Sequence, residues 1–317
     1  MSYTIGSFNV FKMNYRSDDT IKKNFRRIAE IINAEDFDVV ALQEVPSEGA
    51  LKTILLPALG TIKWECAWAP PKSISSEAAE GYAFIWRKQR LKLIEAGGNP
   101  EIYNRYRIKG PVEQGALIRP PYVARFTPQG LVNGGNFELR LINTHIIHSK
   151  STRLVDELSD IDLRKHELKV LSEEIYRLVS TKRYGNNLPA YTILLGDYNL
   201  CLAGPGPKID AEIPITDTRR LKTVQTEKTS LKRPVSQDES KLGPEELDSD
   251  VVDPASIDYY SRNYDHFSYE VTLADKMNLM VSRVDALADY YGNNLADYRK
   301  EISDHVPIKL VLNLKTK

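Results

Sequence analysis

The chain has little cysteine, no excess of charge of either sign and no long apolar run, and each absence excludes a class of protein. The 317 residues include only two cysteines, Cys66 and Cys201, which are too few for a disulfide framework or a thiolate metal cage. Both lie in apolar surroundings typical of buried free thiols, which fits a reducing compartment. Lysine plus arginine and aspartate plus glutamate number 43 each, so a polyanionic partner would have to bind a local basic patch.

No stretch of 18 consecutive apolar residues could span a membrane, and the first 11 residues lack the charged and apolar regions of a signal peptide. We therefore expect a soluble, cytoplasmic protein with no membrane partner, and nothing in the sequence points to a protein partner. Hydrophobic residues make up 42% of the chain, enough for a sizeable core. We expect one domain over residues 1–317, with a flexible acidic loop at 232–258 that holds three prolines and eight acids.

Apolar periodicity predicts a mixture of strands and helices. Alternating or continuous apolar runs predict strands over 3–10, 37–45, 64–70, 81–87, 122–126, 137–147, 191–195, 264–273 and the final IKLVLNL run. Helical spacing predicts a helix that contains Phe25, Ile28 and Ile32 and is capped by Asp18 or Asp19. Two further helices are expected, one from a Ser47 cap to residue 59 and one over 159–182 with Ser159 as its cap.

Five of these strands have an acid, an amide or a histidine at one end. The Gly-Asp-Tyr-Asn stretch at 196–199 could by itself be only a turn, since glycine, aspartate and asparagine all favour turns. The same kind of ending on five strands instead suggests a shared rim, where α/β proteins usually bind ligands. The residues concerned are Asn9, Glu44, His145, Asp197 with Asn199, and Asp304 with His305.

Five short motifs occur in a fixed order along the chain: Phe8-Asn9, Leu42-Gln43-Glu44, Thr144-His145, Gly196-Asp197-Tyr198-Asn199 and Ser303-Asp304-His305. In this order the chain resembles the endonuclease/exonuclease/phosphatase superfamily, and within it the DNase I-like branch, from residue 7 to about residue 313. The resemblance implies an α/β fold with four layers, in which two packed, mixed, mostly antiparallel sheets are flanked by helices. It also implies a Mg²⁺- or Mn²⁺-dependent endonuclease that hydrolyses DNA.

Three further matches lie within the DNase I-like branch. Glu80, in the Glu-Gly-Tyr-Ala-Phe run, resembles the glutamate that pairs with a catalytic histidine, here His145. Arg119 resembles the arginine that grips DNA phosphate. Asp265 follows a tyrosine as in the family's Tyr-Asp motif, whose aspartate orients the other catalytic histidine, here His305.

Two positions and one bond depart from the DNase I pattern. Ala78 stands where DNase I has its minor-groove tyrosine, and Pro120 replaces the acid after the arginine. The disulfide of the secreted enzyme has no counterpart. The resemblance therefore carries the chemistry to this chain, but not the groove contacts or the sequence preference.

Phosphodiester hydrolysis needs an activated water, positive charge on the phosphate and a proton for the leaving oxygen. Glu44 with Asn9 and Asp304 would supply hard oxygen ligands for Mg²⁺ or Mn²⁺. A carboxylate beside each of the two histidines would fix its tautomer and raise its basicity, so that one can act as base and the other as acid. The sequence does not assign these two roles. Asp197 and Asn199 would orient the water and hold a non-bridging oxygen.

Several alternatives stay open at the level of sequence. A phosphatase, a phospholipase or an RNase of the same superfamily would use the same centre, and a catalytically silent module could bind nucleic acid or a protein through the same scaffold. The basic and tyrosine-rich stretch at 97–114 is either a phosphate-backbone contact or a surface loop. His148 and His266 are both expected to point away from the site, because neighbouring residues of an extended chain face opposite sides.

Overall fold

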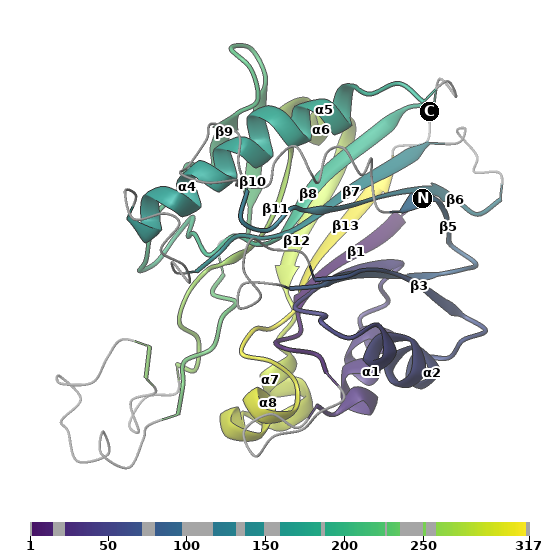
Figure 1. Cartoon of the computed structure of the whole chain (residues 1–317), viewed down its shortest axis with the longest axis vertical. Coiled ribbons are helices and arrows are strands. Elements are labelled where there is room, and N and C mark those ends of the chain that lie inside the picture. The colour runs from purple at the N-terminus through teal and green to yellow at the C-terminus, as the bar shows by residue number, and fades with distance from the viewer. Residues whose placement is uncertain are drawn as a thin grey trace.

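The computed structural model describes residues 2–14, 23–71, 80–96, 117–130, 137–148, 159–184, 188–225, 227–234, 250–251 and 258–314. Two β-sheets lie face to face, and helices cover the outer side of each sheet (Figure 1). The four-layer α/β sandwich predicted from the sequence is confirmed. The stretch at 97–114 and most of the acidic loop at 232–258 lie outside the described residues.

Each sheet is antiparallel except for one central parallel pair. In the first sheet only β1 and β2 are parallel, and its strands run in the order β12 (Met277–Arg283), β13 (Ile308–Leu314), β1 (Ser2–Asn9), β2 (Val39–Gln43), β4 (Tyr82–Arg87), β3 (Trp64–Ala69). In the second sheet only β7 and β8 are parallel, and the order is β5 (Leu91–Ala96), β6 (Tyr122–Pro128), β7 (Glu138–His145), β8 (Ala190–Asp197), β11 (Asp265–Glu270), β10 (Arg220–Val224), β9 (Glu212–Pro214).

The helices divide between the two outer faces (Figure 1). The first sheet is covered by α1 (Phe25–Ala34), the π-helical turn η1 (Ala50–Leu55), α2 (Leu56–Leu59), α7 (Ala286–Tyr291) and α8 (Leu295–Glu301). The second is covered by α4 (Asp160–Val170), η3 (Leu171–Tyr176) and α5 (Arg177–Thr181). A short α6 (Val271–Lys276) follows β11. None of the described helices combines the length and the apolar composition needed to cross a membrane.

Three apolar clusters correspond to the three interfaces between the four layers. Ile28 and Ile32 on α1 pack under the first sheet, as the helical spacing predicts. Phe84 and Leu195 belong to the cluster between the two sheets, and Ile175 to the cluster under the outer helices of the second sheet. Burial of apolar surface in all three interfaces fixes the ends of the central strands relative to one another.

The strand register brings the predicted motifs to one edge of both sheets. In the parallel pairs, Asn9 lies opposite Gln43, and His145 lies opposite Asp197. The antiparallel strand β11 begins beside the end of β8, with Asp265 opposite Asp197. Strands β4 and β13 also start at this edge, because each is antiparallel to a neighbour that ends there. Carboxyl ends of some strands and amino ends of others therefore build the same rim.

The start of the first helix differs from the prediction. Helix α1 begins at Phe25, and the side chain of Asn24 caps it by accepting a hydrogen bond from the Arg27 amide at 3.1 Å. Asp18 and Asp19 lie outside the described residues. Asparagine caps helices as well as aspartate does, so the nearer candidate takes the position.

The strand predicted over 264–273 is shorter than expected. It ends at Glu270, and the chain turns directly into α6. Strand β11 pairs with β8 as far as Tyr269 and with β10 as far as Glu270, which leaves no paired residue beyond Glu270. By contrast, the predicted Ser159 cap is confirmed, since its hydroxyl accepts from the Asp162 amide at 3.1 Å.

A buried ion triad anchors the start of β7, far from the rim. Glu138 is fully buried and pairs with Arg125 and Arg140, which hold the pKa of its carboxyl at about 2, against the desolvation that would raise it. Because the pKa in the folded protein lies below the ordinary value of 4.5, this stabilisation is present above pH 4.5 and is lost as pH falls toward 2.

Glu138→Gln is therefore expected to lower the free energy of unfolding by roughly 3 to 5 kcal/mol at pH 7, because two arginines lose their buried partner. Urea titrations from pH 7 down to pH 2 measure the difference, which should shrink below pH 4.5. The matched control is Glu30→Gln, which removes an exposed i,i+3 pair with Arg27 and should cost about 1 kcal/mol or less. Equal losses in the two variants would contradict the expectation.

Candidate active site

A cleft with a volume of about 430 Å³ opens at the shared edge of the two sheets. Nine of the ten predicted site residues line it, and the tenth, Asp265, lies fully buried behind His305. Segments more than 290 residues apart in sequence thus meet in one cavity. The nine are Asn9, Glu44, Glu80, Arg119, His145, Asp197, Asn199, Asp304 and His305.

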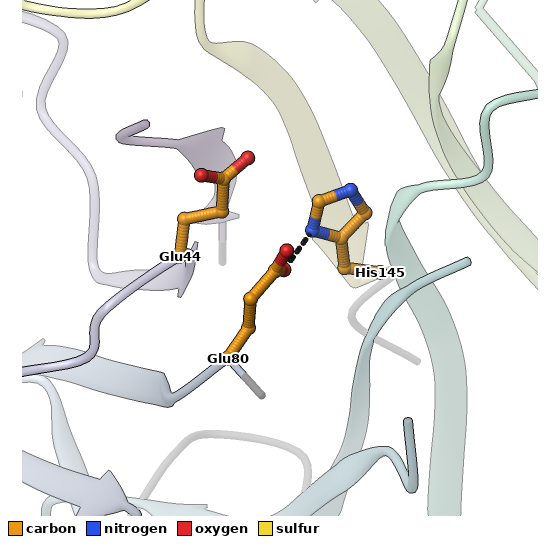
Figure 2. A group of neighbouring side chains, drawn as sticks. All are labelled: Glu44, Glu80 and His145. Carbon is orange, nitrogen blue, oxygen red and sulfur yellow. Dashed lines mark ion pairs between the residues drawn. The ribbon is translucent and has the colours of Figure 1, made fainter. Parts of the chain in front are cut away.

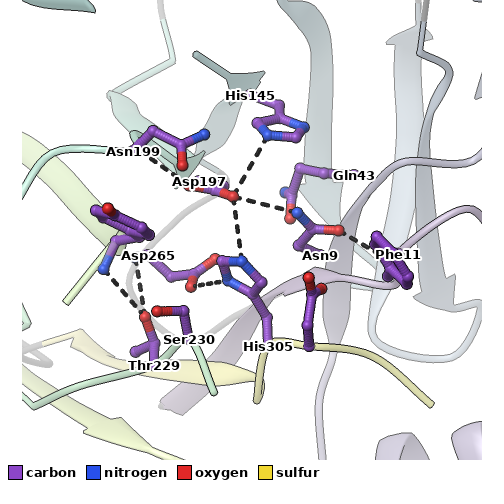
Figure 3. Close-up of polar contacts among 12 residues, drawn as sticks. Asn9, Phe11, Gln43, His145, Asp197, Asn199, Thr229, Ser230, Asp265 and His305 are labelled. Atoms are coloured by element: carbon purple, nitrogen blue, oxygen red, sulfur yellow. Dashed lines mark hydrogen bonds and ion pairs between the residues drawn. The ribbon is translucent and has the colours of Figure 1, made fainter. Parts of the chain in front are cut away.

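The first carboxylate–imidazole pair joins Asp265 and His305 (Figure 3). Asp265 Oδ2 lies 2.7 Å from His305 Nδ1, which directs Nε2 toward the cleft. Asp265 is itself held by Thr229, whose hydroxyl accepts from the Asp265 amide at 3.1 Å. Burial would lower the pKa of His305, but the charges of Asp265 and Asp197 raise it to about 10.

The second pair joins Glu80 and His145 (Figure 2). Glu80 Oε2 lies 2.5 Å from His145 Nδ1, and its other oxygen lies 2.5 Å from Arg119 Nη2. Burial opposes both charges, yet the pair overcomes it: the pKa of Glu80 is lowered by His145 and Arg119, and the pKa of His145 is raised mainly by Glu80. Arg119 is therefore part of a chain that runs Arg119, Glu80, His145.

The two histidines converge on a single carboxylate oxygen (Figure 3). Asp197 Oδ2 lies 3.4 Å from His145 Nε2 and 3.5 Å from His305 Nε2. The same oxygen accepts a hydrogen bond from Asn9 Nδ2 at 3.1 Å, while Asp197 Oδ1 accepts from the Asn199 amide at 2.9 Å. Two imidazoles with their inner nitrogens anchored thus present their outer nitrogens to one small volume of the cleft.

Carboxylates gather on the side of the cleft that contains Glu44. Burial, together with the charges of Glu80 and Asp304, raises the pKa of Glu44, while the charge of His145 and a hydrogen bond from Asn9 act to lower it. Asp304 Oδ1 is buried and has no hydrogen-bond partner among the described residues, while Asp304 Oδ2 lies 3.8 Å from Arg299 Nη2. Close like charges on hard oxygen ligands suit a divalent cation such as Mg²⁺.

Two groups of possible metal ligands occur among the described residues: Glu44 with Glu80 and His145, and Asp197 with Asp265 and His305. In each group, the ligand atoms lie within 4.8 Å of one another. Glu44 belongs to the first group (Figure 2). Since the histidines already pair through Nδ1 with Glu80 and Asp265, Glu44 is the residue best placed to be a dedicated ligand.

Asn9, also expected to be a ligand, lies between the two acids Glu44 and Asp197. Its Nδ2 donates to Glu44 Oε1 at 3.0 Å as well as to Asp197, and its Oδ1 accepts from the Phe11 amide at 3.0 Å. The side chain therefore bridges two carboxylates through its amide nitrogen. This bridge holds the acidic side of the cleft to the histidine side.

Backbone conformations of high energy cluster around the cleft. Seven of the described residues other than glycine have a positive φ, and four of them line the cleft: Phe11, Lys12, Glu44 and Asn199, with φ of 41°, 51°, 57° and 50°. Such conformations cost free energy and persist where the surrounding structure imposes them, often at functional sites.

Gly196 explains why the Gly-Asp-Tyr-Asn stretch begins with glycine. Its φ is 141°, and a Cβ atom at this position would lie 1.9 Å from the carbonyl oxygen of Thr144. Strands β7 and β8 can approach each other closely only because no side chain is present here. This approach places His145 beside Asp197.

Two buried residues of α4 hold the loops of the site, and the sequence analysis did not identify them. Arg164 donates through Nη1 to the carbonyl of Asn199 at 3.0 Å and through Nη2 to the carbonyl of His148. Glu167 accepts from the amides of Ile118 and Ile147 at 2.7 and 3.1 Å. With their i,i+3 spacing, one cation and one carboxylate bind four backbone groups of three loops. We name this pair the α4 clamp.

Glu167→Gln is expected to lower kcat/KM about tenfold or more, because an amide can replace only one of the two accepted bonds and the loops that carry His145 and Arg119 would shift. Steady-state kinetics give the effect on kcat and KM separately, and circular dichroism checks the fold. Glu173→Gln, at a half-buried position of the same helical segment, serves as the control. Equal kinetics in both variants would show that the clamp does not position the site.

The structure corrects the expectation for His148 and bears out the one for His266. His148 lines the cleft, and its ring lies 6.3 Å from the ring of Tyr264, which lines the cleft too. The chain leaves β7 at His145, so the alternation of a strand does not extend to His148. His266 is fully buried, with Nε2 2.8 Å from the Leu200 carbonyl, and is absent from the cleft lining.

We compared the chain with models of known protein families and with curated protein sequences. The model of the Endonuclease/Exonuclease/phosphatase family matches residues 6–215, about two thirds of the chain. The chain belongs to this family. Members of the Endonuclease/Exonuclease/phosphatase family are hydrolases that act on phosphoester bonds and generally depend on a metal ion, in keeping with the cluster of acids around Glu44. A search of curated protein sequences gave no significant match.

Solved structures share the fold at low sequence identity. An endonuclease/exonuclease/phosphatase family protein from Bacteroides thetaiotaomicron aligns with a TM-score of 0.55 and 15% identity over 99% of this chain and 98% of its own. ANGEL2, a 2′,3′-cyclic phosphatase in complex with adenosine-2′,3′-vanadate, aligns with a TM-score of 0.55 and 13% identity over 99% and 96%. D. rerio TDP2, complexed with a single-strand DNA product, has a TM-score of 0.51 and 14% identity over 98% and 99%.

Proposed function

We propose that the protein is a Mg²⁺- or Mn²⁺-dependent phosphodiesterase that cleaves DNA, as a DNase I-like endonuclease. The observation that carries the proposal is the convergence of two carboxylate-anchored histidines on Asp197, with both Nε2 atoms within 3.5 Å of the same oxygen. A phosphodiester bound there would have a proton acceptor and a proton donor within reach of its two reacting oxygens.

Each residue has a distinct role in this proposal. One histidine takes the proton of the attacking water, and the other protonates the leaving oxygen, in one step without a covalent intermediate. Asp265 and Glu80 hold the tautomers of His305 and His145. Asp197 and Asn199 orient the water and a non-bridging oxygen. A divalent cation held by Glu44, with Asp304 and Asn9 close by, would neutralise charge on the phosphate as a Lewis acid.

Arg119 is the proposed contact to the substrate phosphate, and its ion pair with Glu80 places it in the cleft lining. Arg119→Ala is expected to raise KM for DNA by about 10- to 100-fold, because a charge-assisted contact to phosphate is lost. The fall in kcat should be smaller and should reflect the loss of the positive charge that lowers the pKa of His145. Initial rates across a range of DNA concentrations separate the two, and unchanged rates at low DNA concentration would contradict the assignment.

A phosphatase acting on an RNA end or a small phosphoester is the second candidate, because ANGEL2 shares the fold and is a 2′,3′-cyclic phosphatase. The DNA proposal is supported by the match of Arg119 and Glu80 to the DNase I pattern and by the fold shared with TDP2 bound to a DNA product. A silent binding module is disfavoured, because a protein that only binds needs neither anchored histidine.

A substrate panel tests the proposal. Supercoiled plasmid, single-stranded RNA, a 2′,3′-cyclic nucleotide, a phosphomonoester and inositol phospholipid vesicles would each be incubated with wild type in Mg²⁺. Nicking of plasmid at the highest kcat/KM is the expected result. Turnover of a monoester, a cyclic phosphate or a lipid without nicking would overturn the DNA assignment, and no turnover of any member would favour the binding module.

A further inference from the structure

The cleft has a second wall that the catalytic residues do not use. It is built from the described residues 229–234, 250–251 and 258–264. Ser230 forms an isolated β-bridge with His305, and the Leu231 amide donates to the Asp304 carbonyl at 2.8 Å. The wall is thus fixed by backbone hydrogen bonds to the segment that carries His305 (Figure 3 shows Thr229 and Ser230 beside it).

Three arginines from separate segments line this part of the cleft. Arg262 Nη2 lies 3.1 Å from Asp250 Oδ1, and the Arg262 side chain is only 15% exposed. Arg299, on α8, donates through Nη1 to the Leu231 carbonyl at 2.8 Å. Arg233 is exposed at the rim, and its amide donates to the Asp250 carbonyl at 2.8 Å. We call Arg233, Arg262 and Arg299 the arginine wall.

Charge is divided between the two halves of the cleft. The half that contains Glu44 also holds Glu80, Asp197 and Asp304, and its acids suit a cation. The arginine wall adds three positive charges next to this half, where Arg262 pairs with Asp250 at 3.1 Å and Arg299 with Asp304 at 3.8 Å. Planar guanidinium groups match phosphate oxygens in geometry as well as in charge.

We propose that the arginine wall binds a second phosphate group of the substrate, next to the phosphate that reacts. This inference rests on the proposed phosphodiesterase site and names what that site prefers: a substrate with two phosphates over one with a single phosphate. The cleft volume of about 430 Å³ lies within the range of roughly 300–1,000 Å³ of pockets that hold whole small ligands, and so it leaves space beyond the reacting group.

The test compares the binding of two nucleotides that differ by one phosphate. Thymidine 3′,5′-bisphosphate and thymidine 5′-monophosphate would be titrated by calorimetry in Mg²⁺, with recovery of the intact ligand checked afterwards. Wild type is expected to bind the bisphosphate at least about tenfold more tightly, since a charge-assisted contact is gained. The ratio of the two affinities should fall toward one in Arg262→Gln and also in Arg233→Gln. The Arg233 side chain is exposed, so replacing it poses little risk to folding.

Arg219→Gln is the matched control. Arg219 also pairs with one carboxylate, Glu270, at 2.7 Å, and its side chain is 27% exposed, but it lies outside the cleft lining. The control should keep the wild-type ratio. A wild-type ratio of one, or a ratio that survives both Arg262→Gln and Arg233→Gln, would overturn the arginine wall as a phosphate site.

A third ligand identifies the source of the second phosphate. In thymidine diphosphate the two phosphates are adjacent, whereas in the 3′,5′-bisphosphate a nucleoside separates them as it does along a nucleic acid strand. Whichever of the two ligands gains more affinity over the monophosphate shows how far apart the two bound phosphates lie. Binding can be measured without turnover, so the two proposals can fail separately. Tighter binding of the bisphosphate without plasmid nicking would contradict only the proposed endonuclease function. Plasmid nicking with equal affinity for the two nucleotides would contradict only the arginine wall as a phosphate site.

Discussion

His305→Ala is expected to lower kcat/KM for phosphodiester cleavage by about 10²- to 10⁴-fold, the range typical of a lost general acid or base. The imidazole is anchored by Asp265 at 2.7 Å and reaches Asp197 at 3.5 Å, and alanine keeps neither contact. Initial rates of plasmid nicking measure the loss. His166→Ala, on α4 and outside the cleft lining, is the control and should retain wild-type rates.

The pairing of His305 with Asp265 makes a sharper test possible. Asp265 acts only through His305 in this account, so the double variant Asp265→Asn/His305→Ala should be no slower than His305→Ala alone. If the loss of kcat/KM in the double variant equalled the product of the losses in the two single variants, Asp265 would contribute independently of His305. That outcome would contradict its assignment as the residue that positions the imidazole.

Glu44→Gln is expected to abolish most of the response to Mg²⁺, with an affinity loss of about 100-fold or more, because the charged ligand is replaced by a neutral amide. Metal binding is measured by the rise in melting temperature with Mg²⁺ concentration, which requires no substrate. Glu48→Gln, which removes an exposed pair with Lys52, is the control. An unchanged Mg²⁺ response in Glu44→Gln would exclude Glu44 as a metal ligand.

The same variant should be more stable than wild type without metal. Burial and the neighbouring Glu80 and Asp304 raise the pKa of Glu44, so its charge costs free energy at neutral pH. Glutamine keeps the shape and removes that charge. A lower melting temperature for Glu44→Gln in EDTA would instead indicate that the carboxylate stabilises the fold.

The sequence predicted most of the rim but not how it is held. The polar ends of β1, β2, β7 and β8 could be recognised because each follows a buried apolar run. Strands β9 and β10 are short, and their alternate residues are exposed, so their apolar signal is weak. The cap of α1 was misplaced because several residues near its start can cap a helix equally well.

Buried polar residues account for what the sequence did not reveal. Arg164 and Glu167 lie in a polar helical stretch that looks solvent-exposed, yet both are at most 5% exposed and hold backbone groups that appear only once three loops meet. Thr229, Arg233 and Arg262 follow β10 in segments without clear periodicity. Tertiary contacts, and not local pattern, give these residues their role.

One measurement tests the central claim most directly: nicking of supercoiled plasmid by purified wild type in Mg²⁺, after excess EDTA, and after Mg²⁺ is restored. The account predicts nicking that stops with EDTA and resumes with Mg²⁺, and that is lost when either His305 or Glu44 is replaced. Nicking that persists in EDTA, or that survives His305→Ala at the wild-type rate, would contradict it.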